Sequence, residues 1–207
     1  MKRTEKILDI LAQEFPTAKC ELNYETEFQL LVAVILSAQC TDKRVNLVTP
    51  ELFRRYPTVE AFAQAIPEDI EKLIFSCGFY RNKAKNIIAV AKDIVENYGG
   101  EVPASFDELI KLAGVGRKTA NVVTSVAFGG DGIAVDTHVF RVSNRLGLAK
   151  GKTPYEVEMQ LLEKIPAFRR HEAHHLLIFH GRYRCKAISP DCNDCKLKEY
   201  CSDVRTK

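Results

Sequence analysis

Four cysteines near the C-terminus have the spacing that most directly suggests chemistry. They follow the pattern Cys185-x6-Cys192-x2-Cys195-x5-Cys201, whereas the other three cysteines of the 207-residue chain stand singly. In a reducing cell, four thiolates this close together are useful as ligands of one shared metal centre. Structural zinc usually takes two tight pairs, and one Cys-x2-Cys flanked by longer loops better suits a cubane iron–sulfur cluster. The spacing favours iron–sulfur, with zinc and disulfides as the alternatives.

A glycine turn between two helical patterns is the second such feature. Within residues 106–128, Gly114-Val115-Gly116 separates a first helical segment from a second. Two glycines let the backbone turn sharply and approach a partner closely. They also leave free N–H groups at the positive end of the second helix, an arrangement that binds a phosphate oxygen. Val115 would pack the turn against its own helices. An ordinary helix–helix hairpin is the alternative, and this motif alone does not exclude it.

Lys118 and Asp136 are the candidate catalytic residues. Lys118 follows the turn, where the helix dipole and the adjacent Arg117 disfavour an ammonium. A neutral lysine amine is nucleophilic, although contact with a phosphate is the alternative role here. Asp136 lies in the stretch VDTHV (135–139), which opens another helix, and capping that helix is its ordinary role. A capping carboxylate that faces a cleft can also support a developing cation or relay a proton.

Helical periodicity dominates the chain, so we expect an all-α fold. Thr26, Ser105 and Thr153 are each followed three residues later by Gln or Glu, the pattern of a capping box at a helix start. The apolar run 31–36 predicts a helix in the middle of a core. The glycine-rich stretch 129–134 is the clearest break and predicts a domain boundary. We predict helices at residues 4–15, 28–38, 42–55, 59–65, 68–75, 80–98, 106–112, 117–128, 137–146, 154–165 and 169–180.

Composition and charge limit the class of protein. A hydrophobic content of 46% in 207 residues can form one good core or two small ones. No apolar run approaches the roughly 20 residues of a membrane span, and the N-terminus lacks the features of a signal peptide, so we expect a cytoplasmic protein. Residues 166–207 carry nine Lys and Arg against five Asp and Glu. This basic excess suggests a polyanionic partner, with ordinary solvated surface charge as the alternative.

Five motifs together resemble the bacterial endonuclease III family. They are LSAQCTD (36–42), LAGVGRKTANVV (112–123), VDTHV (135–139), HGRYRCKA (180–187) and the cysteine run. They occur in the family's order, and the resemblance extends from about residue 5 to residue 203. The family comprises helix-hairpin-helix DNA glycosylases that carry a [4Fe–4S] cluster, so the resemblance favours that cluster on the four cysteines.

The resemblance implies a two-domain helix-hairpin-helix glycosylase fold. A six-helix barrel domain would span residues 22–131 and contain the hairpin. Residues 1–21 and 132–207 would form the iron–sulfur cluster domain. DNA would lie across the groove between the domains, with Lys118 and Asp136 on opposite walls. We expect the protein to act as a monomer and to be associated with the nucleoid.

The implied activity is base excision repair by a bifunctional DNA glycosylase and AP lyase. The family removes oxidised pyrimidines from double-stranded DNA after flipping the damaged base out of the helix, since C1′ of a stacked nucleotide cannot be reached from a protein cleft. By analogy, Lys118 attacks C1′ and displaces the base, while Asp136 supports the developing positive charge. The resulting Schiff base then allows β-elimination, which cuts the strand 3′ to the lesion.

The resemblance also implies residues that contact DNA. Gln39 would fill the space left by the flipped base, and Phe79 would be an apolar wedge in the base stack, although packing of the turn after Gly78 is its alternative role. His138 and Asp42 match family positions near the pocket. The expected phosphate contacts are Gly114, Val115, Gly116, Arg184 and Lys186. Two departures are Ala113, where the family commonly has proline, and Phe79, where an aliphatic residue is common.

Three other functions are alternatives to a bifunctional glycosylase. HEAHH (171–175) satisfies the H-E-x-x-H pattern of zinc proteases, but no separate third-ligand segment follows it before the cysteine loop. A monofunctional glycosylase of the same superfamily would usually lack Lys118. A non-catalytic DNA-binding or iron–sulfur sensor protein would have no use for Lys118 together with Asp136. The metal centre itself is expected to fold its loop, as structural metals do.

Overall fold

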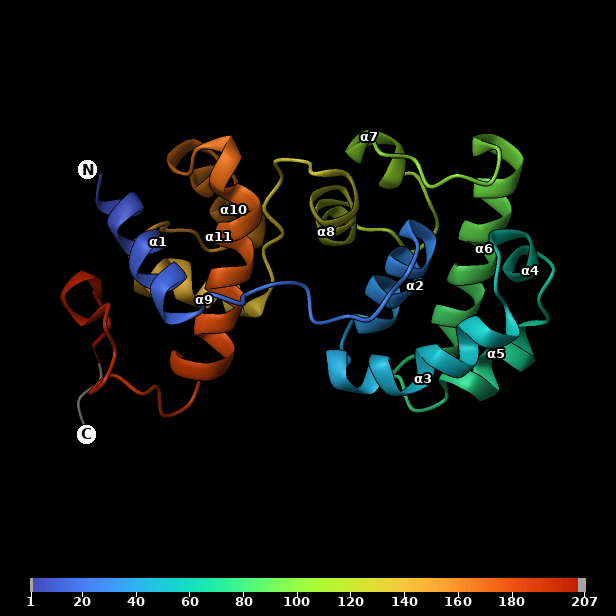
Figure 1. Cartoon of the computed structure of the whole chain (residues 1–207), viewed down its shortest axis with the longest axis horizontal. Helices are drawn as coiled ribbons and strands as arrows, with labels where there is room; N and C mark the ends of the chain where they lie inside the picture. The colour runs from blue at the N-terminus through green and yellow to red at the C-terminus, as the bar shows by residue number, and fades with distance from the viewer. Residues whose placement is uncertain (1, 205–207) are drawn as a thin grey trace. The chain divides into compact units, whose positions relative to one another are not determined.

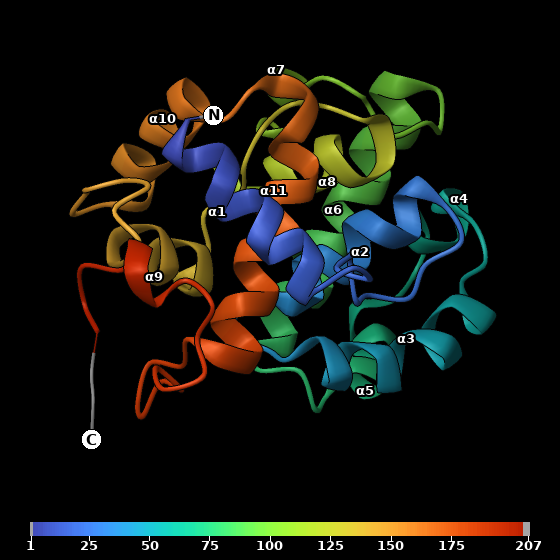
Figure 2. The ribbon, with the colours of Figure 1, turned by 60° about the vertical axis from the view of Figure 1, so that its left-hand side comes forward.

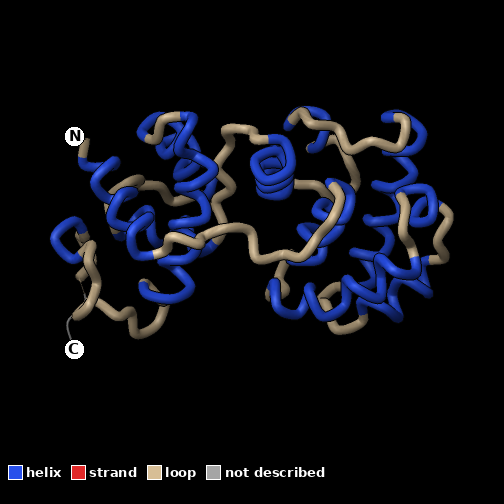
Figure 3. Tube along the Cα trace, in the orientation of Figure 1, coloured by secondary structure: helices blue, strands red, loops and turns tan. Residues whose placement is uncertain are grey.

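The computed structural model describes residues 2–204. The described residues are 62% helical and contain no strand, which confirms the predicted all-α fold (Figure 3). They divide into two compact units: Glu21–Phe128, and Met1–Cys20 together with Gly129–Lys207. No helix within the described range has the length and apolar character needed to cross a membrane.

The unit Glu21–Phe128 is built around one apolar helix. This helix, α2, packs against α3, α6 and α8 (Figure 1). Every residue of the run 31–36 is buried, which confirms the prediction of a central helix. Phe62 packs edge-on against Phe28, with ring centroids 5.3 Å apart. The helices of this unit are α2 (Glu27–Ser37), α3 (Asp42–Arg55), α4 (Val59–Ala63), α5 (Pro67–Ile74), α6 (Tyr80–Tyr98), α7 (Phe106–Leu109) and α8 (Arg117–Phe128).

The second unit joins the N-terminal helix to the C-terminal part of the chain. Ile7, Leu8 and Leu11 of α1 are fully buried in a core that also contains Val139 and Leu177. Figures 1 and 2 show α1 lying beside α11. An Arg169–Asp9 ion pair at 2.7 Å joins these two helices. The helical elements are α1 (Arg3–Glu14), α9 (Thr137–Arg145), α10 (Pro154–Lys164), α11 (Ala167–Phe179), the π-helical turn η1 (His180–Arg184) and the 3₁₀ turn η2 (Lys198–Tyr200).

Two of the three predicted capping boxes form a side-chain cap. Thr26 accepts a hydrogen bond from the Gln29 N–H, and Thr153 accepts one from the Glu156 N–H, each at 3.2 Å. The prediction at Ser105 is wrong, because its side chain makes no cap. The carboxylate expected to reach back to it, Glu108, instead accepts hydrogen bonds from the Tyr98 hydroxyl and the Lys111 ammonium, both at 2.7 Å.

Two helix ends differ from the prediction near residues of functional interest. Helix α7 ends at Leu109 rather than at residue 112, because the chain already enters tight turns there: Leu112 donates to the Leu109 carbonyl. After α11, the chain continues through η1, where the Cys185 N–H donates to the His180 carbonyl at 2.7 Å. This wider turn was not predicted. It carries the chain into the cysteine loop.

Candidate active site and metal centre

The two glycines of the hairpin have different structural roles. Gly114 has φ +73°, and a Cβ built there would lie 2.4 Å from Nδ2 and 2.8 Å from Cβ of Asn86, so only glycine fits. Gly116 lacks a positive φ, and open space surrounds the position of its missing Cβ. Val115 between them is buried, as predicted. The first glycine therefore forms the turn, while the second leaves the backbone open to a partner.

Lys118 is exposed in the first turn of α8, two residues after Gly116. The first N–H groups of a helix have no carbonyl partner within it. In α8, the Ala120 N–H donates to the Gly116 carbonyl oxygen. The guanidinium of Arg117 lies 5.0 Å from the centre of the Phe106 ring. Within the unit Glu21–Phe128, no hydrogen bond or ion pair holds the Lys118 side chain. Its amine is thus available to a ligand.

Asp136 is the N-cap of α9, which confirms the predicted capping role. Its Oδ1 atom accepts hydrogen bonds from the N–H groups of His138 at 2.9 Å and Val139 at 2.8 Å. The residue is half-buried. Because one oxygen takes both backbone bonds, the second carboxylate oxygen remains available to another donor or to a developing positive charge.

Arg141 connects the first turn of α9 to the cysteine loop. Its guanidinium lies 3.2 Å from Nδ1 of His138, and it donates to the carbonyls of Gly181 at 2.9 Å and Cys185 at 3.1 Å. A Cβ at Gly181 would lie 2.8 Å from the His138 Cβ, so α9 and η1 pack as closely as their backbones allow. The half-buried His138 is consequently held in place by this contact.

Gln39 and Phe79 occupy unusual backbone conformations on two adjacent loops. Gln39 has φ +53° and Phe79 has φ +59°; among the described residues, Ser189 is the third non-glycine with a positive φ. Both residues are exposed, and Phe79 retains 65% of its accessible surface. A Cβ at Gly78 would lie 3.7 Å from the Gln39 carbonyl oxygen, so the loops are in contact. Such conformations cost on the order of 1–3 kcal/mol each and concentrate at functional sites.

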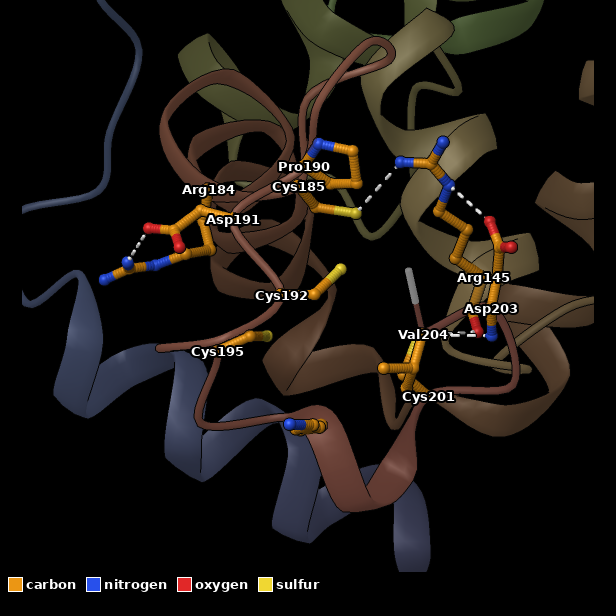
Figure 4. A pocket seen from close by; sticks show the side chains of 11 residues that line it. Arg145, Arg184, Cys185, Pro190, Asp191, Cys192, Cys195, Cys201, Asp203 and Val204 are labelled. Carbon is orange, nitrogen blue, oxygen red and sulfur yellow. Dashed lines mark hydrogen bonds and ion pairs between the residues drawn. The ribbon is translucent and has the colours of Figure 1, made fainter. Parts of the chain in front are cut away.

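The four predicted ligand cysteines line one cavity. Its volume is about 340 Å³ with its open mouth included, and its wall also contains Arg145, Arg184 and Asp203. Figure 4 shows the sulfur atoms of Cys185, Cys192 and Cys195 directed into this space. Within residues 2–204, no three His, Cys, Asp or Glu side chains converge closely enough to hold one metal ion. Burial raises the pKa of the Cys195 and Cys201 thiols.

Arg145 at the end of α9 is the organising residue of this cavity, and the sequence analysis missed it. Its side chain is only 10% exposed and pairs with Asp203 at 2.9 Å. It donates to Sγ of Cys185 at 3.4 Å (Figure 4). It also donates to the Lys186 carbonyl at 2.8 Å. The Asp203 N–H lies 3.4 Å from the Cys201 sulfur. Donors aimed at sulfur favour thiolates over thiols. No local motif marks this arginine, because its partners lie 40 or more residues away.

The two basic residues expected to contact phosphate have different surroundings. Arg184 pairs with the nearly buried carboxylate of Glu14 at 2.9 Å and also with Asp191. These pairs tie the start of the cysteine loop to α1, a structural role that was not anticipated. Lys186 is exposed, and its backbone carbonyl rather than its side chain bonds to Arg145.

The His-Glu-Ala-His-His segment lies on α11 and is largely committed to packing. His174 and His175 are buried, and burial lowers the pKa of His175. The ring Nδ1 of His175 lies 3.0 Å from the His171 carbonyl oxygen. Within residues 2–204, these histidines and Glu172 form no group that could hold a metal ion.

Comparison with known proteins identifies the family. A family model described as the HhH-GPD superfamily base excision DNA repair protein matches residues 32–167. Endonuclease III of Rickettsia conorii is 55% identical over 196 residues, which cover 95% of this chain and 93% of that protein. Endonuclease III of Bacillus subtilis is 53% identical over 204 residues, which cover 98% and 93%. A solved structure of a trapped endonuclease III–DNA covalent intermediate matches with a TM-score of 0.92 and 50% identity, covering 98% of this chain and 97% of that one.

The chain belongs to the HhH-GPD superfamily of base excision DNA repair proteins. Within that class its full-length relatives are endonuclease III enzymes, which are DNA glycosylases with AP lyase activity. The resemblance predicted from the five sequence motifs is thereby confirmed, together with the expected fold and enzyme class. The metalloprotease and non-catalytic alternatives do not describe this family.

Proposed function

We propose that this chain removes oxidised pyrimidines from double-stranded DNA and then cleaves the abasic site by β-elimination, with Lys118 as the nucleophile. The observation that carries the residue assignment is the setting of Lys118. Its amine is exposed, lacks a partner within its own unit and lies two residues after the open backbone of Gly116. A lysine used only for phosphate contact would not need to form a covalent bond, so the two roles are separable by experiment.

The proposed reaction follows from the chemistry of a primary amine. The lone pair of the neutral Lys118 Nζ attacks C1′ of the flipped nucleotide, and the bond from C1′ to the base breaks with its electron pair leaving on the base. Ring opening gives a protonated imine between Nζ and C1′. The imine acidifies the C2′ hydrogen, and loss of that proton expels the 3′ phosphate. Water finally hydrolyses the imine and restores the amine.

Asp136 is proposed to support the positive charge that develops on the sugar. Its Oδ1 is fixed by two backbone N–H groups, which orients the carboxylate, while its second oxygen stays available. A carboxylate pre-oriented in this way gains more from a developing cation than a mobile one, because it needs no reorganisation during the reaction. His138 is proposed to line the same region of its unit through its contacts with Arg141 and Gly181.

Gln39 and Phe79 are proposed to act on the base stack. Their loops touch, and both side chains point away from the core on strained backbone. An exposed aromatic ring can enter a base step as an apolar wedge, and an amide can form hydrogen bonds with an unpaired base. The phosphate contacts are proposed to come from the turn Gly114-Val115-Gly116 and from Lys186. Arg184 would contribute less, since two carboxylates already neutralise it.

The four cysteines are proposed to hold a [4Fe–4S] cluster. They fit this group because all four line one cavity and because Arg145 and the Asp203 N–H donate to two of the sulfur atoms. Hydrogen bonds and a nearby guanidinium stabilise the net negative charge of a cluster bound by four thiolates. When bound, the cluster supplies folding energy to the loop that presents Lys186, and we assign it no step in the reaction.

Three further assignments complete the proposal. Residues 22–131 would form the six-helix barrel domain, and residues 1–21 with 132–207 the iron–sulfur cluster domain. The protein would work as a monomer on DNA in the cytoplasm.

The test compares two lysines of the same hairpin. Lys118→Gln and Lys111→Gln each remove one positive charge from an exposed position, but Lys111 is paired with Glu108. With a duplex oligonucleotide containing thymine glycol, we expect Lys118→Gln to abolish strand cleavage while retaining DNA binding, and Lys111→Gln to cleave normally. Equal cleavage by both variants would refute Lys118 as the nucleophile.

A further inference from the structure

Two cysteines outside the metal loop come together beneath the loops of Gln39 and Phe79. Cys40 follows Gln39 after α2, and Cys77 precedes Gly78 and Phe79 after α5. The two loops are in contact, as the position of Gly78 against the Gln39 carbonyl shows. The Cys77 and Cys40 thiols are also near enough to interact electrostatically, with Cys40 among the groups that raise the pKa of Cys77. Residues 37 positions apart in sequence thus form a dithiol pair.

The surroundings of the pair give the two thiols different reactivity. Cys77 is fully buried, whereas Cys40 is partly exposed. Burial and the neighbouring Cys40 raise the pKa of Cys77 to about 11. The buried ammonium of Lys83 donates to the Leu36 carbonyl at 2.8 Å and acts electrostatically on both thiols. Solvent reaches Cys40 rather than Cys77, so a dissolved oxidant meets the Cys40 sulfur first.

We propose that Cys40 and Cys77 are an oxidation-sensitive pair that closes to an intramolecular disulfide when a peroxide is present. The Cys40 sulfur attacks one oxygen of hydrogen peroxide and the O–O bond breaks, which gives a sulfenic acid on Cys40. The other peroxide oxygen takes up the thiol proton and leaves as one water. The Cys77 sulfur then attacks the Cys40 sulfur, and the sulfenic oxygen leaves as a second water. Two thiols are oxidised and one peroxide is reduced to two waters. A dithiol such as dithiothreitol reverses the change by exchange.

The cross-link would tie together the two loops that carry Gln39 and Phe79. Each loop holds a non-glycine residue at positive φ, a strained conformation that the surrounding contacts maintain. A covalent bond between their bases limits how far the side chains above can move apart. The consequence for catalysis rests on the proposed function: insertion into duplex DNA requires these loops to adjust, so the oxidised enzyme should excise a paired lesion more slowly.

The first test detects the bond directly in the intact protein. After brief exposure to hydrogen peroxide and alkylation of the remaining thiols, tryptic digestion should give a cross-linked species of residues 20–43 and 73–81 that dithiothreitol separates. Cys20 falls in the first peptide, so Cys20→Ser is the matched control and should keep the cross-link. Cys77→Val should abolish it while preserving side-chain bulk. Absence of the cross-linked species from the wild type, or its loss from Cys20→Ser, would overturn the proposal.

The second test separates this inference from the proposed function. Oxidised and reduced proteins are assayed on a duplex containing thymine glycol and on single-stranded DNA with an abasic site, where no base stack has to be opened. We expect oxidation to slow duplex excision several-fold, reversibly, in the wild type but not in Cys77→Val, and to leave single-strand cleavage unchanged. Equal duplex rates in both redox forms would refute the inhibitory role. Lack of cleavage by the reduced protein would instead count against the proposed function.

Discussion

Substituting the two hairpin glycines separately should distinguish Gly114, which forms the turn, from Gly116, which we propose contacts DNA. In Gly114→Ala, the left-handed φ of +73° costs about 1–2 kcal/mol for a residue with a Cβ. The new Cβ would also lie 2.4 to 2.8 Å from three atoms of Asn86, including its Cβ, and such overpacking typically costs about 1–3 kcal/mol. We therefore expect the free energy of unfolding to fall by about 2–5 kcal/mol.

Gly116→Ala should leave the free energy of unfolding nearly unchanged but weaken DNA binding, so it is the control for Gly114→Ala. Open space surrounds its Cβ position and its φ is not positive, so we expect the free energy of unfolding to change by less than about 0.5 kcal/mol. The methyl group would project from the backbone that we propose contacts a phosphate, so DNA affinity should fall. Urea denaturation followed by circular dichroism, and fluorescence anisotropy with labelled duplex, measure the two effects. Wild-type stability in Gly114→Ala, or undiminished affinity in Gly116→Ala, would refute this reasoning.

Three further predictions concern the unit that contains the cysteine loop. Burial lowers the pKa of His180 from 6.5 to about 4. The unfolded chain therefore takes up a proton at this histidine before the folded chain does, so the free energy of unfolding is highest above pH 6.5 and decreases as the pH falls toward 4. Urea titrations should show a loss of about 2 kcal/mol between about pH 7 and pH 5 that is smaller in His180→Gln. Arg145→Met should lower the free energy of unfolding by about 2–3 kcal/mol and weaken retention of the visible absorbance of the proposed iron–sulfur cluster, because Asp203 and the Cys185 sulfur lose their donor. Unchanged absorbance and stability would contradict the role given to Arg145. Lys186→Ala should reduce the slope of log affinity against log salt concentration by about one, and an unchanged slope would remove Lys186 from the phosphate contacts.

The features that sequence predicted well are those set by local geometry. The apolar run 31–36 has no polar face, so its helix had to be central, and all of it is buried. Asp136 precedes a helical pattern directly, and its capping bonds follow from that position. The turn at Gly114 was also predicted locally, from the two closely spaced glycines. The structure then shows that Gly114 and Gly116 have different roles.

The features that sequence did not predict depend on contacts between distant segments. Nothing in the residue types of Gln39 and Phe79 predicts a positive φ, because neighbouring loops rather than local preference impose it. Ser105 has the expected partner three residues later, but Glu108 bonds with Tyr98 and Lys111 instead. Arg184 was expected to contact phosphate, and its ion pair with Glu14 was not foreseen because that residue lies 170 positions away. Pairing across such distances leaves no periodic signal.

Reductive trapping of the protein on DNA tests the central claim most directly. Sodium borohydride converts an imine between an amine and an opened sugar into a stable secondary amine. We predict that incubation with a duplex containing an abasic site yields a covalent protein–DNA adduct whose mass spectrum maps to Lys118, and that Lys118→Gln yields none. An adduct mapped to another residue, or strand cleavage that persists in Lys118→Gln, would contradict the account.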